Sequence, residues 1–348
     1  MTTDDEPPWV HDDWSDLLKM PPGVAEELAN LDPVLTGPKR HHFVPRFYLK
    51  GFCRDGLLAV YDREKNEIRN QKPDDTTVIG HFYTAIDEQG RKRFELEKAL
   101  STIESSASPV IQKLVNKEEI SDTERMDLAL FVGLGMCRTP DHIDSIKSLN
   151  EQMVKQMNRF AFGSKEQAKQ VVKNCSDPPS TEEELEEAAA ALFDLVENDE
   201  YEVETHPQWA LGMALQMFSV IVPIIVQRHW RVLHRDNEKR SFITSDAPVV
   251  LTTVAPRPPG FMHRGIGFAN QDALVVFPLS ESAMLLIYGE GGDTKHMTGS
   301  ANDIRHFNLM IAERCQRFLM GRDATLVRSL TDHLKLANKK WQPKMGTH

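Results

Sequence analysis

The chain has 348 residues, of which 40% are hydrophobic and 7% aromatic, so it can bury a sizeable core and is not a disordered protein. Its net charge of −11 is concentrated in two segments without a basic residue: residues 1–16 hold six acids and residues 181–204 hold eleven. The remainder is therefore mildly basic. This permits a phosphate-bearing ligand but lacks the strong positive bias of a dedicated nucleic-acid-binding protein.

Composition also bears on the compartment. The four cysteines lie far apart and form no C-x-x-C pair, which indicates reduced thiols and a cytoplasmic protein. The N-terminus lacks the basic and apolar regions of a secretory signal. Residues 209–226 form a stretch of 18 without a charge, but Gln216 and Pro223 lie inside it. We therefore expect a buried core helix that is kinked or ended near Pro223, and no stable membrane span.

The first part of the chain predicts an acidic arm followed by strands. Residues 1–38 are rich in Asp, Pro and Gly and predict a flexible arm. After it, two pairs of short alternating segments flank polar turns, which is typical of β-hairpins. The first pair is 57–62 with 67–70, and the second is 81–86 with 91–94.

Helices follow, as an expected insertion at about 95–228. Apolar residues recur every three or four positions over 94–114, which predicts a helix. Capping-box patterns at Ser121, Ser164 and Thr181 each predict a helix start, and another helix should begin at Pro140. The helix after Thr181 carries eleven acids up to residue 204. We expect these carboxylates to be exposed, because burying them would be too costly.

The last third returns to strands. Alternating or apolar runs predict strands at 230–234, 241–244, 249–253, 273–277 and 284–288, with a Pro/Gly-rich loop at 255–267. Two helices, at about 301–316 and 324–337, flank a short strand at 318–321. Strands, then helices, then strands indicate an α+β fold. We expect a single domain, 39–340, whose mostly antiparallel sheet combines the N-terminal hairpins with the later strands.

The most unusual segment is residues 39–52, KRHHFVPRFYLKGF, in which two histidines and four cations stand among aromatic residues. The ordinary pKa of histidine lies close to neutral, so His41 or His42 can transfer protons or bind a metal or a phosphate. Adjacent side chains of a strand point to opposite faces, so at most one of them should face a given pocket. The alternative is a packing anchor, because Tyr48 and Phe52 lie one helical turn apart.

Other segments supply charged or polar side chains. Asp246 follows an apolar strand, where a carboxylate acts as a base, a metal ligand or an orienter of histidine, or else closes an Asx-turn. Arg138 precedes Thr139-Pro140 at a helix end, where it either complements the helix dipole or clamps an anion. Glu97 and Glu104 share one helix face, directed towards the hairpins or towards solvent. Asn308 either caps a backbone group or binds a ligand.

In order and spacing, these segments resemble an uncharacterised, mainly bacterial family known as domain of unknown function 4238, which opens with H-x-V-P-x-x-Y-L-x-x-F. The resemblance spans residues 39–320 and extends to the segments 82–83, 95–104, 138–140, 230, 242–249, 277–280 and 308. One departure is Ala247, where many members have Asn. The family has no established activity, so the resemblance implies positions for a site without naming its chemistry.

The hypothesis that unites these features is a hydrolase acting on a phosphodiester, in a nucleic acid or a nucleotide. A cation, a histidine and a carboxylate together suit the charge of a phosphorane-like transition state, with a divalent metal as a possible cofactor. The alternative is a non-catalytic ligand-sensing or protein-binding module. We expect the site residues to meet in one cleft between the hairpins and the 230–288 strands. The expected catalytic residues are His41, His42 and Asp246, and the expected substrate-binding residues are Arg46, Tyr48, Arg138 and Asn308.

Overall fold

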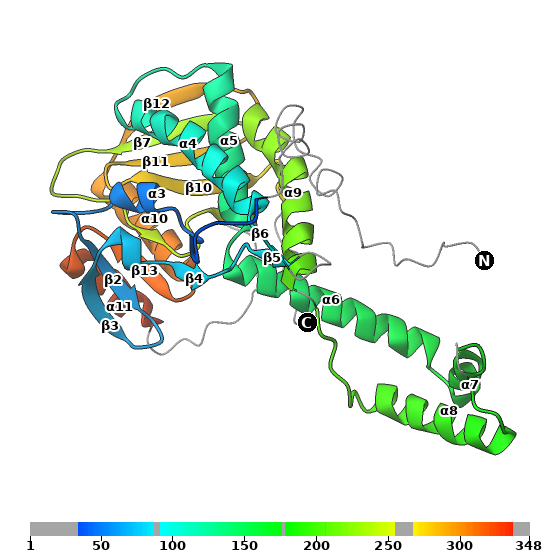
Figure 1. The fold of residues 1–348 in the computed structure, drawn as a ribbon. Coiled ribbons are helices and arrows are strands. Elements are labelled where there is room, and N and C mark those ends of the chain that lie inside the picture. Colours follow the sequence, from blue (N-terminus) through cyan, green and yellow to red (C-terminus); the bar gives the residue numbers. More distant parts are fainter. Residues whose placement is uncertain (1–33, 87–90, 176–177, 206, 255–266, 337–348) are drawn as a thin grey trace. The chain divides into compact units, whose positions relative to one another are not determined.

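The computed structural model describes residues 34–86, 91–175, 178–205, 207–254 and 267–336 (Figure 1). Most of the expected arm at 1–38 and nearly all of the expected loop at 255–267 lie outside these residues. The chain divides into two compact units. The described residues of the larger unit are in 34–142 and 212–336, and those of the smaller unit are in 143–211.

The larger unit contains a five-stranded sheet. Its strands are β7 (His229–Arg235), β9 (Val250–Thr253), β10 (Ala273–Ser280), β11 (Ala283–Tyr288) and β12 (Thr294–Gly299). They lie in the order β12-β7-β11-β10-β9, and every neighbouring pair is antiparallel except β12 and β7, which are parallel. All eight residues of β10 are buried, as expected for a central strand that is covered on both faces.

A second sheet is built around the first predicted hairpin, which the structure confirms. The strands are β2 (Leu58–Asp62), β3 (Glu67–Gln71), β8 (Thr244–Ser245) and β13 (Phe318–Gly321), in the order β3-β2-β13-β8. The expected single sheet is divided in two: β8, from the 230–288 region, lies in the hairpin sheet, whereas β7, β9, β10 and β11 form the five-stranded sheet with β12. The two main sheets share a hydrophobic core with the two C-terminal helices.

Two further short strand pairs lie in the described residues, and one of them contains His41 and His42. β1 (Arg40–His42) pairs antiparallel with β4 (Val78–Gly80), and β5 (Ala85–Ile86) pairs with β6 (Lys92–Arg93). The second predicted hairpin is thus present, with its turn outside the described residues. A short helix, α3 (Arg46–Lys50), follows β1, and a 3₁₀-helix, η1 (Pro73–Asp75), precedes β4.

Helices of the larger unit cover the sheets. They are α4 (Glu95–Val115), α5 (Asp122–Cys137), most of α9 (Pro207–Gln227), α10 (Ala301–Arg314) and α11 (Ala324–Leu334). Figure 1 shows α4 and α5 crossing one face of the five-stranded sheet. The capping box at Ser121 opens α5, and α9 continues past Pro223 instead of ending there. Among the described residues, no helix is both long and apolar enough to cross a membrane.

The smaller unit is helical. It contains most of α6 (Pro140–Ala161), followed by α7 (Lys165–Lys173) and α8 (Glu182–Glu197). All eleven carboxylate residues of 181–204 are exposed, as predicted, and α8 buries Leu185, Ala189 and Val196. The capping box at Thr181 is also present. Helices between strand-rich segments make the fold class α+β, as the sequence predicts.

Candidate active site between helices α3 and α4

An open cleft lies between the histidine segment and helix α4. Its volume is about 600 Å³. We call it the α3–α4 cleft, and it is lined by His42, Arg46, Phe47, Glu97, Ser101, Glu104, Ser105, Ser108 and Pro109. We expected a cleft against the 230–288 strands, whereas this one lies against α4, and no residue of 230–288 lines it.

The two histidines separate as strand geometry requires. In β1, His41 is buried and His42 is partly exposed. His42 lines the cleft, and its Nε2 atom lies 3.3 Å from the carbonyl oxygen of Asp74. Burial lowers the pKa of His42, with a smaller opposing effect from that carbonyl. The imidazole is therefore neutral at pH 7 and able to accept a proton.

Both ring nitrogens of His41 form hydrogen bonds with the backbone. Its side chain is 0% exposed, and its Nδ1 atom accepts the N–H of Tyr83 at 2.9 Å. Nε2 must then carry the proton, which it donates to the carbonyl of Pro38 at 2.9 Å. Burial lowers the pKa of His41, in agreement with a neutral ring. The ring of Tyr83 stacks on it with centroids 5.6 Å apart. These contacts indicate a structural role for His41, which links β1 to the backbone at Pro38 and Tyr83.

Helix α4 contributes two carboxylates to the cleft. Burial, followed by the neighbouring charge of Glu104, raises the pKa of Glu97 to about 7, while Arg138 opposes the rise. The side chain of Glu97 is 26% exposed, and its Oε2 atom lies 3.8 Å from Nδ1 of His41. A carboxyl group that titrates near neutrality and lines a cleft is a candidate for proton transfer.

Arg138 lies behind these carboxylates. Its Nη1 atom donates to Oε1 of Glu104 at 2.7 Å, and its side chain is only 1% exposed. Within the described residues, its Nε and Nη2 atoms have no hydrogen-bond partner. The phenol of Tyr83 donates to the backbone carbonyl of Arg138 at 3.4 Å. The charge of Arg138 is thus buried beside the two carboxylates, where electrostatic effects are strong.

Arg46 is the cation at the mouth of the cleft. Its Nη1 atom lies 2.6 Å from Oδ1 of Asp74, and both side chains are about half exposed. Such an exposed pair contributes little to stability. An incoming anion can therefore replace the carboxylate of Asp74 at the guanidinium.

Three expected site residues are instead occupied by hydrogen bonds inside the protein. The hydroxyl of Tyr48 lies 2.8 Å from both Thr244 Oγ1 and the carbonyl of Pro278. The amide of Asn308 accepts the N–H of Ile243 and donates to the carbonyl of Ser241. Both side chains are buried, so we leave them out of the candidate site.

Asp246 is the third of these residues. Its carboxylate accepts the backbone N–H groups of residues 316, 317 and 318, at distances of 3.0, 2.6 and 2.9 Å. Burial nevertheless raises its pKa, because desolvation outweighs these hydrogen bonds. Asp246 is not among the residues that line the α3–α4 cleft. Its contacts fix the segment between α10 and β13, so it is also left out of the candidate site.

Ser101 and Ser105 are cleft residues that sequence reasoning did not single out. Together with Glu97 they form a row along α4. A second hollow, of about 650 Å³, lies beside this row and shares Glu97, Ser101 and Ser105 with the α3–α4 cleft. The four-residue spacing of Ser101 and Ser105 was the sequence signal that could have placed both side chains on the same helix face as Glu97. Among the described residues, no group of three or more His, Cys, Asp or Glu side chains has an arrangement that could hold a metal ion.

Comparison with known proteins places the chain in a family. Residues 40–325 match the family described as "Protein of unknown function (DUF4238)". The match spans most of the chain, so the protein belongs to this family. No curated protein and no solved structure matches it. The chemistry therefore has to be argued from the cleft itself.

Proposed function

We propose that the protein is a hydrolase of a phosphodiester, in a nucleic acid or a nucleotide, and that the α3–α4 cleft is its active site. The observation that carries this proposal is that Glu97, whose pKa is about 7, lines the same cleft as His42 and Arg46. A proton donor, a proton acceptor and a cation around one space suit the hydrolysis of a phosphodiester.

The proton transfers follow from the two pKa shifts. His42, neutral at pH 7, takes a proton from the attacking water as its oxygen bonds to phosphorus. Glu97 is about half protonated at pH 7. It gives its proton to the leaving oxygen as the other P–O bond breaks. The rate should therefore rise with pH as His42 loses its proton and fall as Glu97 ionises near pH 7.

The phosphate binds to Arg46 in this proposal. A guanidinium makes two parallel hydrogen bonds to phosphate oxygens, and Asp74 is exchanged for the substrate. Arg138 is too buried to touch the phosphate, and we assign it a positioning role because it holds Glu104 and neutralises its charge. Less negative charge then remains in the cleft to repel the substrate.

The two hollows favour a nucleic acid over a mononucleotide. They flank the row of Glu97, Ser101 and Ser105, so a nucleic-acid strand can extend on both sides of the reacting phosphate. The serine hydroxyls offer hydrogen bonds to sugar or phosphate oxygens. We further propose that the protein acts in the cytoplasm, because its four cysteines are free, and Cys137 and Cys315 are buried as thiols.

A cleavage assay with the full chain tests the proposal. Single-stranded and double-stranded DNA, RNA and bis-p-nitrophenyl phosphate are each incubated with EDTA, with Mg²⁺ and with Mn²⁺. We expect cleavage of at least one substrate, and at least a tenfold loss of rate in His42→Gln. The matched control is His333→Gln on α11, which is exposed and should leave the rate unchanged.

Two outcomes would count against a hydrolase. If no substrate is cleaved under any of the three conditions, the proposed reaction is wrong, and saturable binding without cleavage would favour the ligand-sensing alternative. If His42→Gln and His333→Gln cleave at equal rates, the activity does not arise in the α3–α4 cleft.

A further inference from the structure

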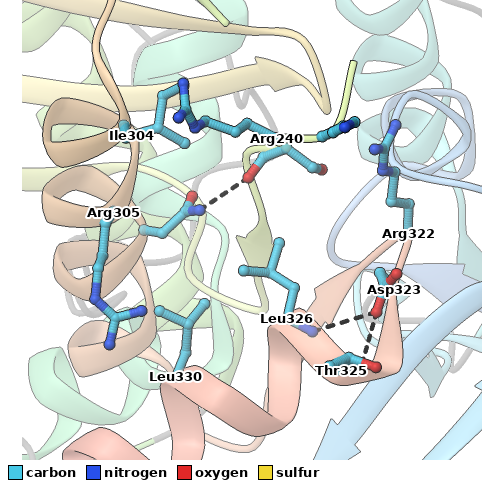
Figure 2. A pocket seen from close by; sticks show the side chains of 12 residues that line it. Arg240, Ile304, Arg305, Arg322, Asp323, Thr325, Leu326 and Leu330 are labelled. Carbon is cyan, nitrogen blue, oxygen red and sulfur yellow. Dashed lines mark hydrogen bonds between the residues drawn. The ribbon is translucent and has the colours of Figure 1, made fainter. Parts of the chain in front are cut away.

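A third hollow lies away from the α3–α4 cleft, between α10, α11 and residues 239–241. Its volume is about 340 Å³. Figure 2 shows the arginine side chains of Arg240, Arg305 and Arg322 around the aliphatic side chain of Leu326. The hollow shares no lining residue with the α3–α4 cleft, so it is a separate candidate site.

The charge of the hollow is strongly positive. Four cations line it, Lys239, Arg240, Arg305 and Arg322, against a single carboxylate, Asp323. The carboxylate of Asp323 caps helix α11, because it accepts the N–H groups of residues 325 and 326 at 2.7 and 3.3 Å.

The four cations differ in their partners. Arg240 pairs with Asp236, and Arg322 pairs with Glu281 at 2.8 Å. Among the described residues, neither Lys239 nor Arg305 has a carboxylate within salt-bridge distance. Two unpaired cations beside two paired ones leave an excess of positive charge that a bound anion would neutralise.

The remaining lining is aliphatic. Ile304 and Leu330 are buried and belong to the core, whereas Leu326 is partly exposed to the hollow. A ligand that fills this space therefore contacts both hydrocarbon and guanidinium groups. The volume is at the small end of the usual range for ligand sites, about 300–1,000 Å³.

From these features we infer that this hollow binds a small organic anion, a phosphate monoester or carboxylate that carries a short aliphatic group. Arg305 and Lys239 would bind the anionic head, because guanidinium and ammonium groups recognise both phosphate and carboxylate oxygens. Leu326 would contact the aliphatic part. This inference does not depend on the proposed hydrolase, because the two sites have no residue in common.

Calorimetric titration of the full chain tests the binding. The probes are n-hexyl phosphate, hexanoate, inorganic phosphate and n-hexanol. We expect n-hexyl phosphate or hexanoate to bind one site per chain, about tenfold or more tighter than inorganic phosphate and n-hexanol. The comparison between the two hexyl anions decides which head group is preferred.

Variants then locate the site. Arg305→Gln and Lys239→Gln should each weaken binding of the preferred hexyl anion by about tenfold. The matched control is Arg328→Gln, an exposed arginine of α11 that does not line the hollow. It should bind like the unaltered protein. Melting curves establish that all three variants are folded.

Three results would overturn the inference. The first is the absence of saturable binding of both hexyl anions at millimolar concentration. The second is inorganic phosphate binding as tightly as n-hexyl phosphate, since Leu326 would then contribute nothing. The third is binding in folded Arg305→Gln and Lys239→Gln that equals binding in Arg328→Gln.

Discussion

Nη1 of Arg138 lies 2.7 Å from Oε1 of Glu104, although 34 residues separate them in the chain. This ion pair connects the C-terminal end of α5 to the middle of α4, directly behind the α3–α4 cleft. The two charges act on Glu97 in opposite directions, because Glu104 raises its pKa and Arg138 lowers it. The protonation of Glu97 therefore reports on the arrangement of all three side chains.

The two histidines should differ in their effect on stability. His41→Gln removes a buried ring that hydrogen-bonds at both nitrogens, so we expect a loss of about 1–3 kcal/mol in the free energy of unfolding. His42→Gln, at the cleft surface, should change it by no more than about 0.5 kcal/mol. Urea unfolding of both variants measures the difference. Equal losses in the two variants would show that His42 is also structural.

The raised pKa of Glu97 should make the protein less stable as pH rises. The native state keeps the proton up to about pH 7, whereas the unfolded chain loses it near the ordinary value of 4.5. The free energy of unfolding contributed by this group is therefore highest below pH 4.5 and falls as pH rises to about 7.

Glu97→Gln removes that fall. The free energy of unfolding of the variant, relative to that of the unaltered protein, should therefore increase as pH rises from about 4 to about 8. The lowered pKa values of His41 and His42 have the opposite pH dependence, but they are present in both proteins and cancel in the difference. Unfolding curves across this range provide the test. A stability difference that does not vary with pH would mean that the pKa of Glu97 is ordinary.

Glu104→Gln should lower the pKa of Glu97. The substitution removes a neighbouring negative charge and leaves the charge of Arg138 uncompensated, and both changes favour ionised Glu97. Under the proposed mechanism, the alkaline limb of the pH–rate profile then moves to lower pH. NMR titration of the glutamate carboxyl carbons checks the pKa independently of activity. A shift of the Glu97 resonance to higher pH would contradict the electrostatic account.

Asp246 should matter for folding. An amide in its place directs N–H groups at backbone N–H donors, so Asp246→Asn is expected to lose about 1–3 kcal/mol of unfolding free energy. Asp272→Asn is the control, because that side chain is exposed. Comparable unfolding midpoints for the two variants would show that the three hydrogen bonds to Asp246 contribute little.

Much of the fold could be predicted from local sequence. The capping boxes at Ser121 and Thr181 mark helix starts that the structure shows, because capping depends on residues within one turn. Strand β12 was missed. It forms the edge of its sheet and pairs with β7, about sixty residues earlier in the chain, and its sequence TKHMTG lacks the alternation that indicates a strand.

The candidate site was only partly predictable from the sequence, because it also depends on contacts between residues that are distant in the chain. The motif pointed to His42 and Arg46, but the same motif contains Tyr48, whose hydroxyl bonds to Thr244 in the core. A polar residue that fixes the fold and one that faces a ligand look alike in a single sequence. The pKa of Glu97 arises from burial and from charges on other turns and another helix, so no local pattern could reveal it.

The measurement that tests the account most directly is the rate of phosphodiester cleavage by Glu97→Gln, compared with Glu313→Gln, an exposed glutamate of α10. Loss of a general acid costs about 100-fold or more in kcat. We expect a loss of that size in Glu97→Gln, together with loss of the alkaline limb near pH 7, and no change in Glu313→Gln. If Glu97→Gln is folded and cleaves the substrate at the rate of Glu313→Gln, the α3–α4 cleft is not the active site.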